Sequence, residues 1–104
     1  MVKFLEMELN LGKSTDGKRF LSEKNILYRR QPQAELGGGL AYALGWIVQK
    51  HRGLDVVWHD GSTTNYESSL YLYPEKKSGF VILTNGAKDD INSAIRKKIL
   101  EIWF

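Results

Sequence analysis

The residues best suited to chemistry form one short run near the middle of the chain, where His59 is followed by Asp60, Gly61 and Ser62. A histidine changes charge near pH 6.5 and can move protons beside a reacting group, and a glycine lets a bound molecule approach the backbone closely. The same run has a simpler interpretation, because Asp-Gly pairs are frequent in hairpin turns. Residues 59–62 are therefore a candidate site, and both interpretations stay open.

Other combinations of reactive residue types are weaker candidates. A triad of His59 and Asp60 with Ser62, Ser68 or Ser69 is disfavoured, because neighbouring residues of a strand or turn rarely point at one another. A metal site needs three or four converging ligands, and His51, His59 and the scattered carboxylates have no recognised spacing. The glycine run at residues 37–39 lacks the spacing of a phosphate-binding loop. We expect neither a metal ion nor a cofactor.

The overall composition is that of one small globular domain. The chain has 104 residues, of which 42% are hydrophobic and 26% charged, and it has no cysteine. This length allows a single core but not a two-domain enzyme, and a disulfide scaffold is excluded. No apolar run approaches the roughly 20 residues that span a bilayer. Acidic residues within the first ten positions argue against a signal peptide, so the sequence indicates no compartment.

The charge distribution does not favour a nucleic-acid partner. The formal net charge is +3, and the tight basic cluster at residues 96–98 lies late in a predicted helix, where cations are favourable. Nucleic-acid surfaces concentrate lysine and arginine in a patch or stripe. Trp46 and Trp58 fall in predicted strands that carry few arginines, so they are expected to pack in the core rather than stack on bases.

The middle of the chain predicts the sheet that would position residues 59–62. Four runs rich in β-branched and aromatic residues follow one another, separated by turn-like joints, one of them at Asp60-Gly61. Short joints imply antiparallel neighbours. Two of the runs are apolar on both faces, which is typical of a strand covered on both sides. The predicted strands cover residues 42–50, 54–59, 66–73 and 79–85.

The N-terminal part predicts a helix and a long connector. Residues 1–11 have apolar residues at spacings of three and four, which is typical of an amphipathic helix. Residues 12–41 are rich in turn-forming residues and end in a glycine joint at residues 37–39. Within the connector, a serine cap predicts a short helix over residues 22–29.

The C-terminal part predicts the longest helix, over residues 88–103, with Asp89 and Asp90 at its start. Its apolar residues form one stripe, which is expected to pack on the sheet. The fold class is therefore α+β: an antiparallel sheet of about four strands, with a C-terminal helix on it, an N-terminal helix and a long connector. The predicted stripe consists of Ile91, Ala94, Ile95, Ile99 and Ile102.

Four short motifs follow one another in a specific order, at residues 42–46 (YALGW), 57–61 (VWHDG), 72–75 (LYPE) and 81–85 (VILTN). The series resembles the C-terminal part of serine β-lactamases and penicillin-binding-protein-like hydrolases, in their class C and esterase-like branch. The resemblance covers nearly the whole chain, 1–104, and implies part of a β-lactamase/transpeptidase-like fold. Members of that family are often periplasmic or extracellular.

The resemblance also implies roles for the candidate residues. The family combines a Ser-x-x-Lys nucleophile motif, a Tyr-x-Asn motif and a Lys/His-x-Gly strand that forms one wall of the active site. The third element corresponds to His59-Asp60-Gly61, and the amide of Ser62 would then hold the oxyanion. Relatives usually have Gly, Thr or Ser at the middle position, so Asp60 is a departure that we expect to put a carboxylate near the cleft.

The other two elements do not occur, since the sequence contains neither Ser-x-x-Lys nor Tyr-x-Asn. The resemblance therefore implies a fragment of a serine hydrolase whose nucleophile lies on the remainder of the domain, which is its expected partner. The parent reaction is acyl transfer to serine and hydrolysis of a lactam, ester or peptide amide, and the isolated chain is expected to be inactive. The alternative is a non-catalytic interaction module. Exposed sheet faces also predict a homodimer, with exchange of the N-terminal helix across residues 37–39 as the favoured route.

Overall fold

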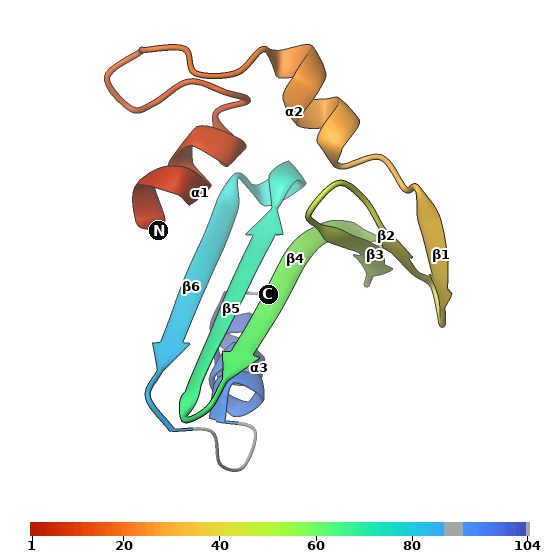
Figure 1. Ribbon diagram of the computed structural model, residues 1–104, viewed down its shortest axis with the longest axis vertical. Coiled ribbons are helices and arrows are strands. Elements are labelled where there is room, and N and C mark those ends of the chain that lie inside the picture. The colour runs from red at the N-terminus through yellow and green to blue at the C-terminus, as the bar shows by residue number, and fades with distance from the viewer. Residues whose placement is uncertain (87–90, 104) are drawn as a thin grey trace.

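The computed structural model describes residues 1–86 and 91–103 and contains one antiparallel sheet in which every strand pairs with the next along the chain (Figure 1). The predicted α+β class is confirmed. The helices are α1 (Val2–Leu9), α2 (Glu23–Arg29) and α3 (Ile91–Trp103), with a short 3-10 helix, η1 (Pro74–Lys76), between the last two strands. The six strands are β1 (Ala34–Gly37), β2 (Leu40–Tyr42), β3 (Ile47–His51), β4 (Leu54–Thr63), β5 (Tyr66–Tyr73) and β6 (Ser78–Thr84).

The sheet has six strands where the sequence predicted about four. The predicted strand at residues 42–50 is broken, because β2 ends at Tyr42 and β3 begins only at Ile47. Between them the chain turns at Gly45, whose φ of 85° lies in the left-handed region that favours glycine. The remaining extra strand, β1, lies in the predicted connector and pairs with β2.

The predicted turn at Asp60-Gly61 is wrong. Both residues lie inside β4, which continues to Thr63, and the hairpin turns at Asn65 with a φ of 66°. Asparagine tolerates this left-handed conformation better than most other residues. β4 and β5 therefore form a long hairpin, and residues 59–62 lie along its length.

The glycine run is a hairpin turn between β1 and β2. Gly37, Gly38 and Gly39 have φ values of 86°, 61° and 81°. Three consecutive positive φ values are unfavourable for residues with a Cβ atom, which explains the glycines. The predicted flexible joint is thus ordered in this structure and pairs two strands.

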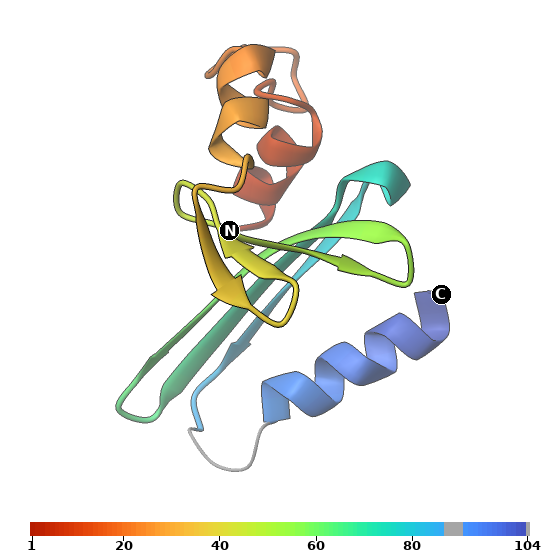
Figure 2. The same cartoon turned by 90° about the vertical axis from the view of Figure 1, so that its right-hand side faces the viewer.

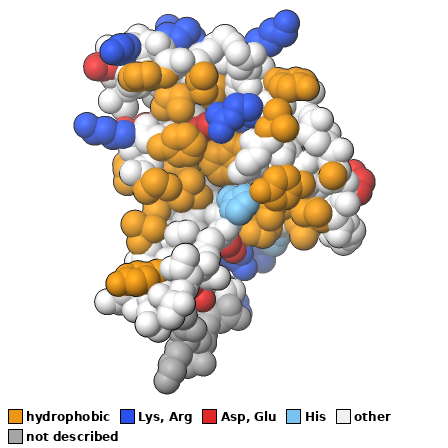
Figure 3. Space-filling view, viewed as in Figure 1, with side chains coloured by type: hydrophobic (Ala, Val, Ile, Leu, Met, Phe, Trp, Pro, Cys, Tyr) orange, Lys and Arg blue, Asp and Glu red, His pale blue; other side chains and the backbone are white. Residues whose placement is uncertain are grey.

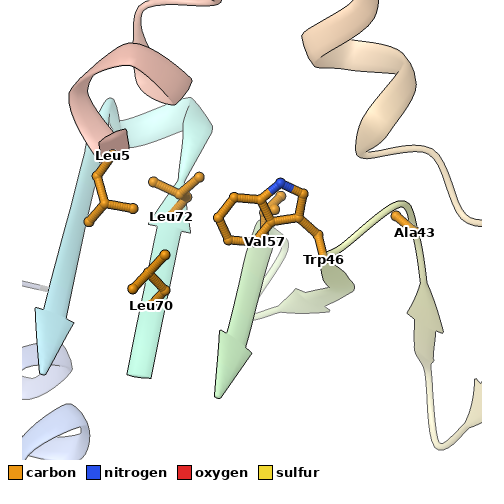
Figure 4. Close-up of a cluster of buried hydrophobic side chains, with 6 residues drawn as sticks. All are labelled: Leu5, Ala43, Trp46, Val57, Leu70 and Leu72. Carbon is orange, nitrogen blue, oxygen red and sulfur yellow. The ribbon is translucent and has the colours of Figure 1, made fainter. Parts of the chain in front are cut away.

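Different helices cover the two faces of the sheet (Figures 1 and 2), because successive side chains of a strand point to opposite faces. We call these the α1 face and the α3 face. The buried cluster on the α1 face consists of Leu5, Ala43, Trp46, Val57, Leu70 and Leu72 (Figure 4). The cluster on the α3 face consists of Val56, Tyr71, Tyr73, Phe80 and Ile82, with Trp58, Ile99 and Leu100 packed against it.

An aromatic row crosses three strands on the α3 face. The ring of Trp58 stacks on that of Tyr71 with centroids 5.4 Å apart, and Tyr71 stacks on Phe80 at 5.2 Å. Such stacked pairs contribute roughly 0.5–1.5 kcal/mol each beyond their buried area. The row therefore fixes the register of β4, β5 and β6 at the level just before His59.

The face of α3 that meets the sheet agrees with the predicted stripe only in part, because Ile99 packs on the sheet. Asn92 is buried, with 6% of its surface exposed, and its amide bridges the hydroxyl groups of Ser69 and Thr84. This network turns the asparagine side of the helix toward the sheet. Three residues of the predicted stripe are exposed by 43%, 38% and 72%, namely Ile91, Ile95 and Ile102. The predicted helix start with Asp89 and Asp90 lies outside the described residues.

The N-terminal region is held together by α2 and a buried ion pair. The side chain of Ser22 accepts a hydrogen bond from the amide of Asn25 at 3.1 Å, so the predicted helix cap is confirmed. The carboxylate of Glu8 on α1 contacts the guanidinium groups of Arg29 and Arg30 at the end of α2 and just after it. None of the three helices in the described part of the chain has the length and hydrophobicity needed to cross a bilayer.

A candidate active-site wall on strand β4

The candidate residues lie on a stretch of β4 that has a partner strand on one side. β5 pairs with β4 as far as Thr63, whereas β3 pairs with it only up to Trp58. In residues 1–86 and 91–103, no strand covers the second edge of β4 from His59 onward. An open edge presents backbone N–H and C=O groups to an approaching chain or substrate. Because β3 starts only at Ile47, opposite Trp58, the backbone of β4 that carries the candidate residues is exposed along this edge.

Side-chain alternation divides the four candidates between the two faces. His59 and Gly61 belong to the α1 face, and Asp60 and Ser62 belong to the α3 face. Asp60 and Ser62 line a cavity of about 400 Å³ beside α3, which Arg96 also lines. The carboxylate expected beside the cleft thus lies on the face opposite to His59. The structure does not bring Ser62, His59 and Asp60 together as a triad.

The imidazole of His59 has a hydrogen-bond partner at each nitrogen. Its Nδ1 lies 2.6 Å from the backbone oxygen of Asp60, and its Nε2 lies 3.1 Å from the hydroxyl of Tyr42. The two rings meet edge to face, with centroids 6.0 Å apart and an interplanar angle of 87°. Sequence reasoning missed Tyr42 as a site residue, although it is the first residue of the YALGW motif.

Gly61 places no side chain on the α1 face beside His59. A Cβ atom at this position would lie 2.9 Å from the hydroxyl of Ser68 on the neighbouring strand. The serine side chain would then have to move, so a larger residue would crowd the α1 face at this level. The glycine leaves the backbone of the open stretch accessible beside the imidazole.

Buried polar groups support the wall from the α3 face. The amide of Asn92 donates to the hydroxyl of Ser69 at 3.2 Å and accepts from Thr84 at 3.0 Å. Nearby, the guanidinium of Arg96 donates to the hydroxyl of Tyr71. Burial raises the pKa of Tyr71, and the positive charge of Arg96 opposes that rise. These bonds tie α3 to β6 and to β5, the strand that pairs with β4.

The described residues contain no group of three or more His, Cys, Asp or Glu side chains arranged to hold a metal ion. The carboxylate of Asp60 belongs to the face of the sheet opposite to His59. What the site offers chemically is one imidazole, one phenol hydroxyl and an open strand backbone. These groups can transfer a proton and donate hydrogen bonds to a developing oxyanion.

Comparisons with known proteins agree with this architecture. A family model described as Beta-lactamase matches residues 1–101. The structure of the octameric penicillin-binding protein homologue from Pyrococcus abyssi is similar to this chain, with a TM-score of 0.71 and 25% sequence identity, over 81% of this chain and 19% of that chain. The unguisins hydrolase ungD' of Aspergillus campestris is 39% identical over 44 residues, which are 42% of this chain and 8% of that protein.

The chain spans about a fifth of the solved relative and less than a tenth of the curated one. The resemblance to the serine β-lactamase and penicillin-binding-protein group is confirmed, because both comparisons and the family model point to it. Since that model matches nearly the whole length, the chain belongs to the beta-lactamase family.

Proposed function

We propose that this chain forms one wall of a serine hydrolase active site of β-lactamase/penicillin-binding type, with His59 as its proton-transfer group. The observation that carries the proposal is the position of His59 and Gly61 on one face of β4, at the point where the strand edge becomes open. A substrate that lies along this edge reaches the imidazole and the strand backbone together. The reaction is acyl transfer to a serine, followed by hydrolysis of a lactam, ester or peptide amide.

Each wall residue has a separate task in this proposal. His59 takes or returns the proton that moves when the serine attacks the acyl carbon. The amide of Ser62, on the open stretch of β4, donates to the oxyanion, a contribution of roughly 2.7–4 kcal/mol in serine hydrolases. Gly61 lets the acyl group lie against the backbone. Asp60 lies on the α3 face, where it lines the same cavity as Arg96, so it is placed away from the reacting acyl group.

The nucleophile comes from the remainder of the domain in this proposal, since the chain has no Ser-x-x-Lys or Tyr-x-Asn motif. Two features support docking of that remainder. The α3 stripe of Ile91, Ile95 and Ile102 is exposed, and β6 has no strand on its outer edge within the described part of the chain. Apolar side chains also gather on the face seen in Figure 3. Exposed apolar surface beside an open edge is typical of an interface.

The same surface supports self-association when the remainder is absent. We propose a two-fold dimer of the isolated chain, in which exchange of the N-terminal helix requires opening of the hairpin at residues 37–39. Sedimentation at tens of micromolar, a range suited to a weak or moderate dimer, tests this proposal. A dimer that becomes a monomer with Ile95→Lys supports pairing through the α3 stripe, and a folded wild-type monomer contradicts self-association.

The second candidate function is a non-catalytic interaction module. It is favoured by the exposed α3 stripe and the open β6 edge, which need no active site to bind another chain. The two candidates differ in whether His59 matters for turnover. An interaction module keeps its binding when His59 is replaced, whereas an active-site wall loses acylation.

The test uses a chimera in which this chain replaces the corresponding 19% of the Pyrococcus abyssi homologue. His59→Ala should lower the acylation rate of a chromogenic lactam or nitrophenyl ester by roughly 10²- to 10⁴-fold, the usual range for a positioned proton-transfer group. The matched control is His51→Ala, which removes an exposed histidine of β3 outside the wall and should leave the rate unchanged.

Two results would contradict the proposal. An unchanged acylation rate in the His59→Ala chimera would remove the histidine from the mechanism. Turnover by the isolated chain that is blocked by a serine-directed inhibitor and by Ser62→Ala would show that the chain carries its own nucleophile.

A further inference from the structure

We propose that Tyr42 is a positioning residue that holds Nε2 of His59 beside the open edge of β4, in an imidazole whose proton is on Nδ1, so that the lone pair of Nε2 is the basic site. Assigning this base to acyl transfer rests on the proposed function. The arrangement of the proton does not, because it follows from the hydrogen bonds of the imidazole alone.

The backbone of Asp60 determines which nitrogen carries the proton. Nδ1 of His59 lies 2.6 Å from the backbone oxygen of Asp60. A carbonyl oxygen accepts hydrogen bonds and cannot donate them, so Nδ1 must be the N–H donor of this contact. In a neutral imidazole the other nitrogen then has a lone pair and no proton. Nε2 is therefore an acceptor.

Tyr42 completes the arrangement from the other side of the ring. Its hydroxyl lies 3.1 Å from Nε2, and since Nε2 accepts, the tyrosine donates. When the imidazole is protonated, the N–H at Nε2 donates instead, and the tyrosine oxygen accepts after its hydroxyl rotates. The same contact therefore serves both protonation states and keeps Nε2 at one place beside the open edge of β4.

Strand pairing in the sheet fixes the backbone position of Tyr42. It is the last residue of β2, where it pairs with Ile47 of β3, and Ile47 pairs in turn with Trp58 of β4. Just beyond it, the amide of Ala43 donates to the backbone oxygen of Trp46 at 2.7 Å and closes the turn. Because β3 begins only at Ile47, no residue of β3 lies between Tyr42 and His59, and the side chain of Tyr42 reaches the imidazole.

A contact of this kind affects the chemistry through geometry. A hydrogen-bond partner at one ring nitrogen of a histidine fixes the ring so that the other nitrogen can accept or release a proton. When a partner is lost, the ring can rotate away from that orientation. Phenylalanine at position 42 keeps the edge-to-face ring contact and removes only the hydroxyl. Tyr42→Phe therefore isolates the hydrogen bond from the packing.

The experiment measures the tautomer of His59 directly in the isolated wild-type chain. Long-range ¹H–¹⁵N correlation spectra at pH 8.5, where imidazoles are ordinarily neutral, separate a protonated from an unprotonated ring nitrogen. We expect His59 to have its proton on Nδ1, while the exposed His51 gives an internal reference in the same spectrum. Tyr42→Phe should leave the proton on Nδ1 and shift the ¹⁵N signal of Nε2, because that nitrogen loses its hydrogen-bond donor while the contact of Nδ1 with the Asp60 backbone oxygen remains.

The matched control is Tyr66→Phe, which removes the hydroxyl of a tyrosine that is 61% exposed at the far end of the hairpin. It should leave the His59 signals in place. A proton on Nε2 of His59 in the wild-type chain, or signals of His59 that are the same in Tyr42→Phe and wild type, would overturn the inference.

In the active chimera, Tyr42→Phe should lower kcat with little change in KM, and Tyr66→Phe should change neither. The two proposals fail separately. If His59→Ala leaves acylation intact while the Nδ1–H tautomer is observed, the proposed function is wrong and the tautomer inference stands. If His59→Ala abolishes acylation while the proton is on Nε2, the function stands and the positioning role of Tyr42 is wrong.

Discussion

Replacement of Glu8 by glutamine tests whether the ion pair between α1 and α2 holds the N-terminal helices against each other. Glu8 is fully buried, and its carboxylate oxygens lie 2.5 Å from Nη1 of Arg29 and 3.3 Å from Nη2 of Arg30. Arg30 also donates to the backbone oxygen of Glu8 at 2.5 Å. Burial lowers the pKa of Arg30, and the negative charge of Glu8 opposes that change. The buried guanidinium is therefore compensated by this one carboxylate.

The expected loss of stability follows from the burial of the pair. Removal of one partner from a buried ion pair leaves the other charge without compensation and costs about 3–5 kcal/mol. Glutamine keeps an oxygen that can still accept from one arginine, which places Glu8→Gln near the lower end, at about 3 kcal/mol. For a domain of this size, each kcal/mol lowers the midpoint of thermal unfolding by about 4–8 °C, so Tm should fall by roughly 12–24 °C.

Urea denaturation followed by circular dichroism measures the change, with thermal unfolding as a second measurement. The matched control is Glu6→Gln on the same helix, since Glu6 has no ion pair among the described residues and should stay within about 0.5 kcal/mol of wild type. The double variant Glu8→Gln/Arg30→Gln should recover part of the loss, which a double-mutant cycle expresses as a coupling energy. A Glu8→Gln variant as stable as Glu6→Gln would refute the reasoning.

Three further outcomes follow from the structure. Burial raises the pKa of Tyr71, so the folded state keeps the phenol proton to a higher pH than the unfolded state does. The free energy of unfolding, measured by urea denaturation, should therefore fall as the pH rises above about 10. The fall should be less steep in Tyr71→Phe. Gly12 has a φ of 100°, and a Cβ would lie 2.0 Å from the backbone oxygen of Leu21, so Gly12→Ala should cost more than 1–3 kcal/mol of backbone strain, whereas Gly17→Ala, in open space, should cost about 1 kcal/mol. Asn92→Ala removes the partner of the buried Ser69 hydroxyl and of the half-buried Thr84 hydroxyl, and should cost about 1–3 kcal/mol in the same assay.

Local patterns in the sequence predicted the central strands well. The boundaries of β5 agree with the prediction, since Tyr66–Tyr73 contains three tyrosines and two leucines and is bounded by turn residues. The C-terminal helix and the short helix after Ser22 were also predictable, because helical periodicity and a serine cap are local signals. These elements are enough to identify an antiparallel α+β fold.

The errors arise where contacts between distant residues decide the structure. Asp60-Gly61 has the composition of a turn, but pairing with β5 continues through both residues and overrides that local preference. The orientation of α3 depends on Asn92, whose partners Ser69 and Thr84 lie 23 and 8 residues earlier. Apolar periodicity cannot reveal such a polar network, so the predicted stripe was right for Ile99, which packs on the sheet, and wrong for Ile91, Ile95 and Ile102, which are exposed.

The candidate site was predictable only in part for the same reason. His59 and Gly61 could be singled out by residue type and motif, and strand alternation explains why they share a face. Tyr42 lies 17 residues away from His59, and the contact exists only because β3 begins beyond the turn at Gly45. A sequence read as one continuous strand over residues 42–50 hides that approach.

The distribution of the aromatic side chains has a spectroscopic consequence. The three tryptophans occupy three environments: Trp46 is 2% exposed and stacks on Phe4 of α1, Trp58 stacks in parallel on Tyr71, and Trp103 meets the edge of Phe80 at the end of α3. The emission of each indole therefore responds to the separation of a different pair of elements. A set of single-tryptophan variants would resolve whether α1, the central hairpin or α3 leaves first as the chain unfolds, with no label attached.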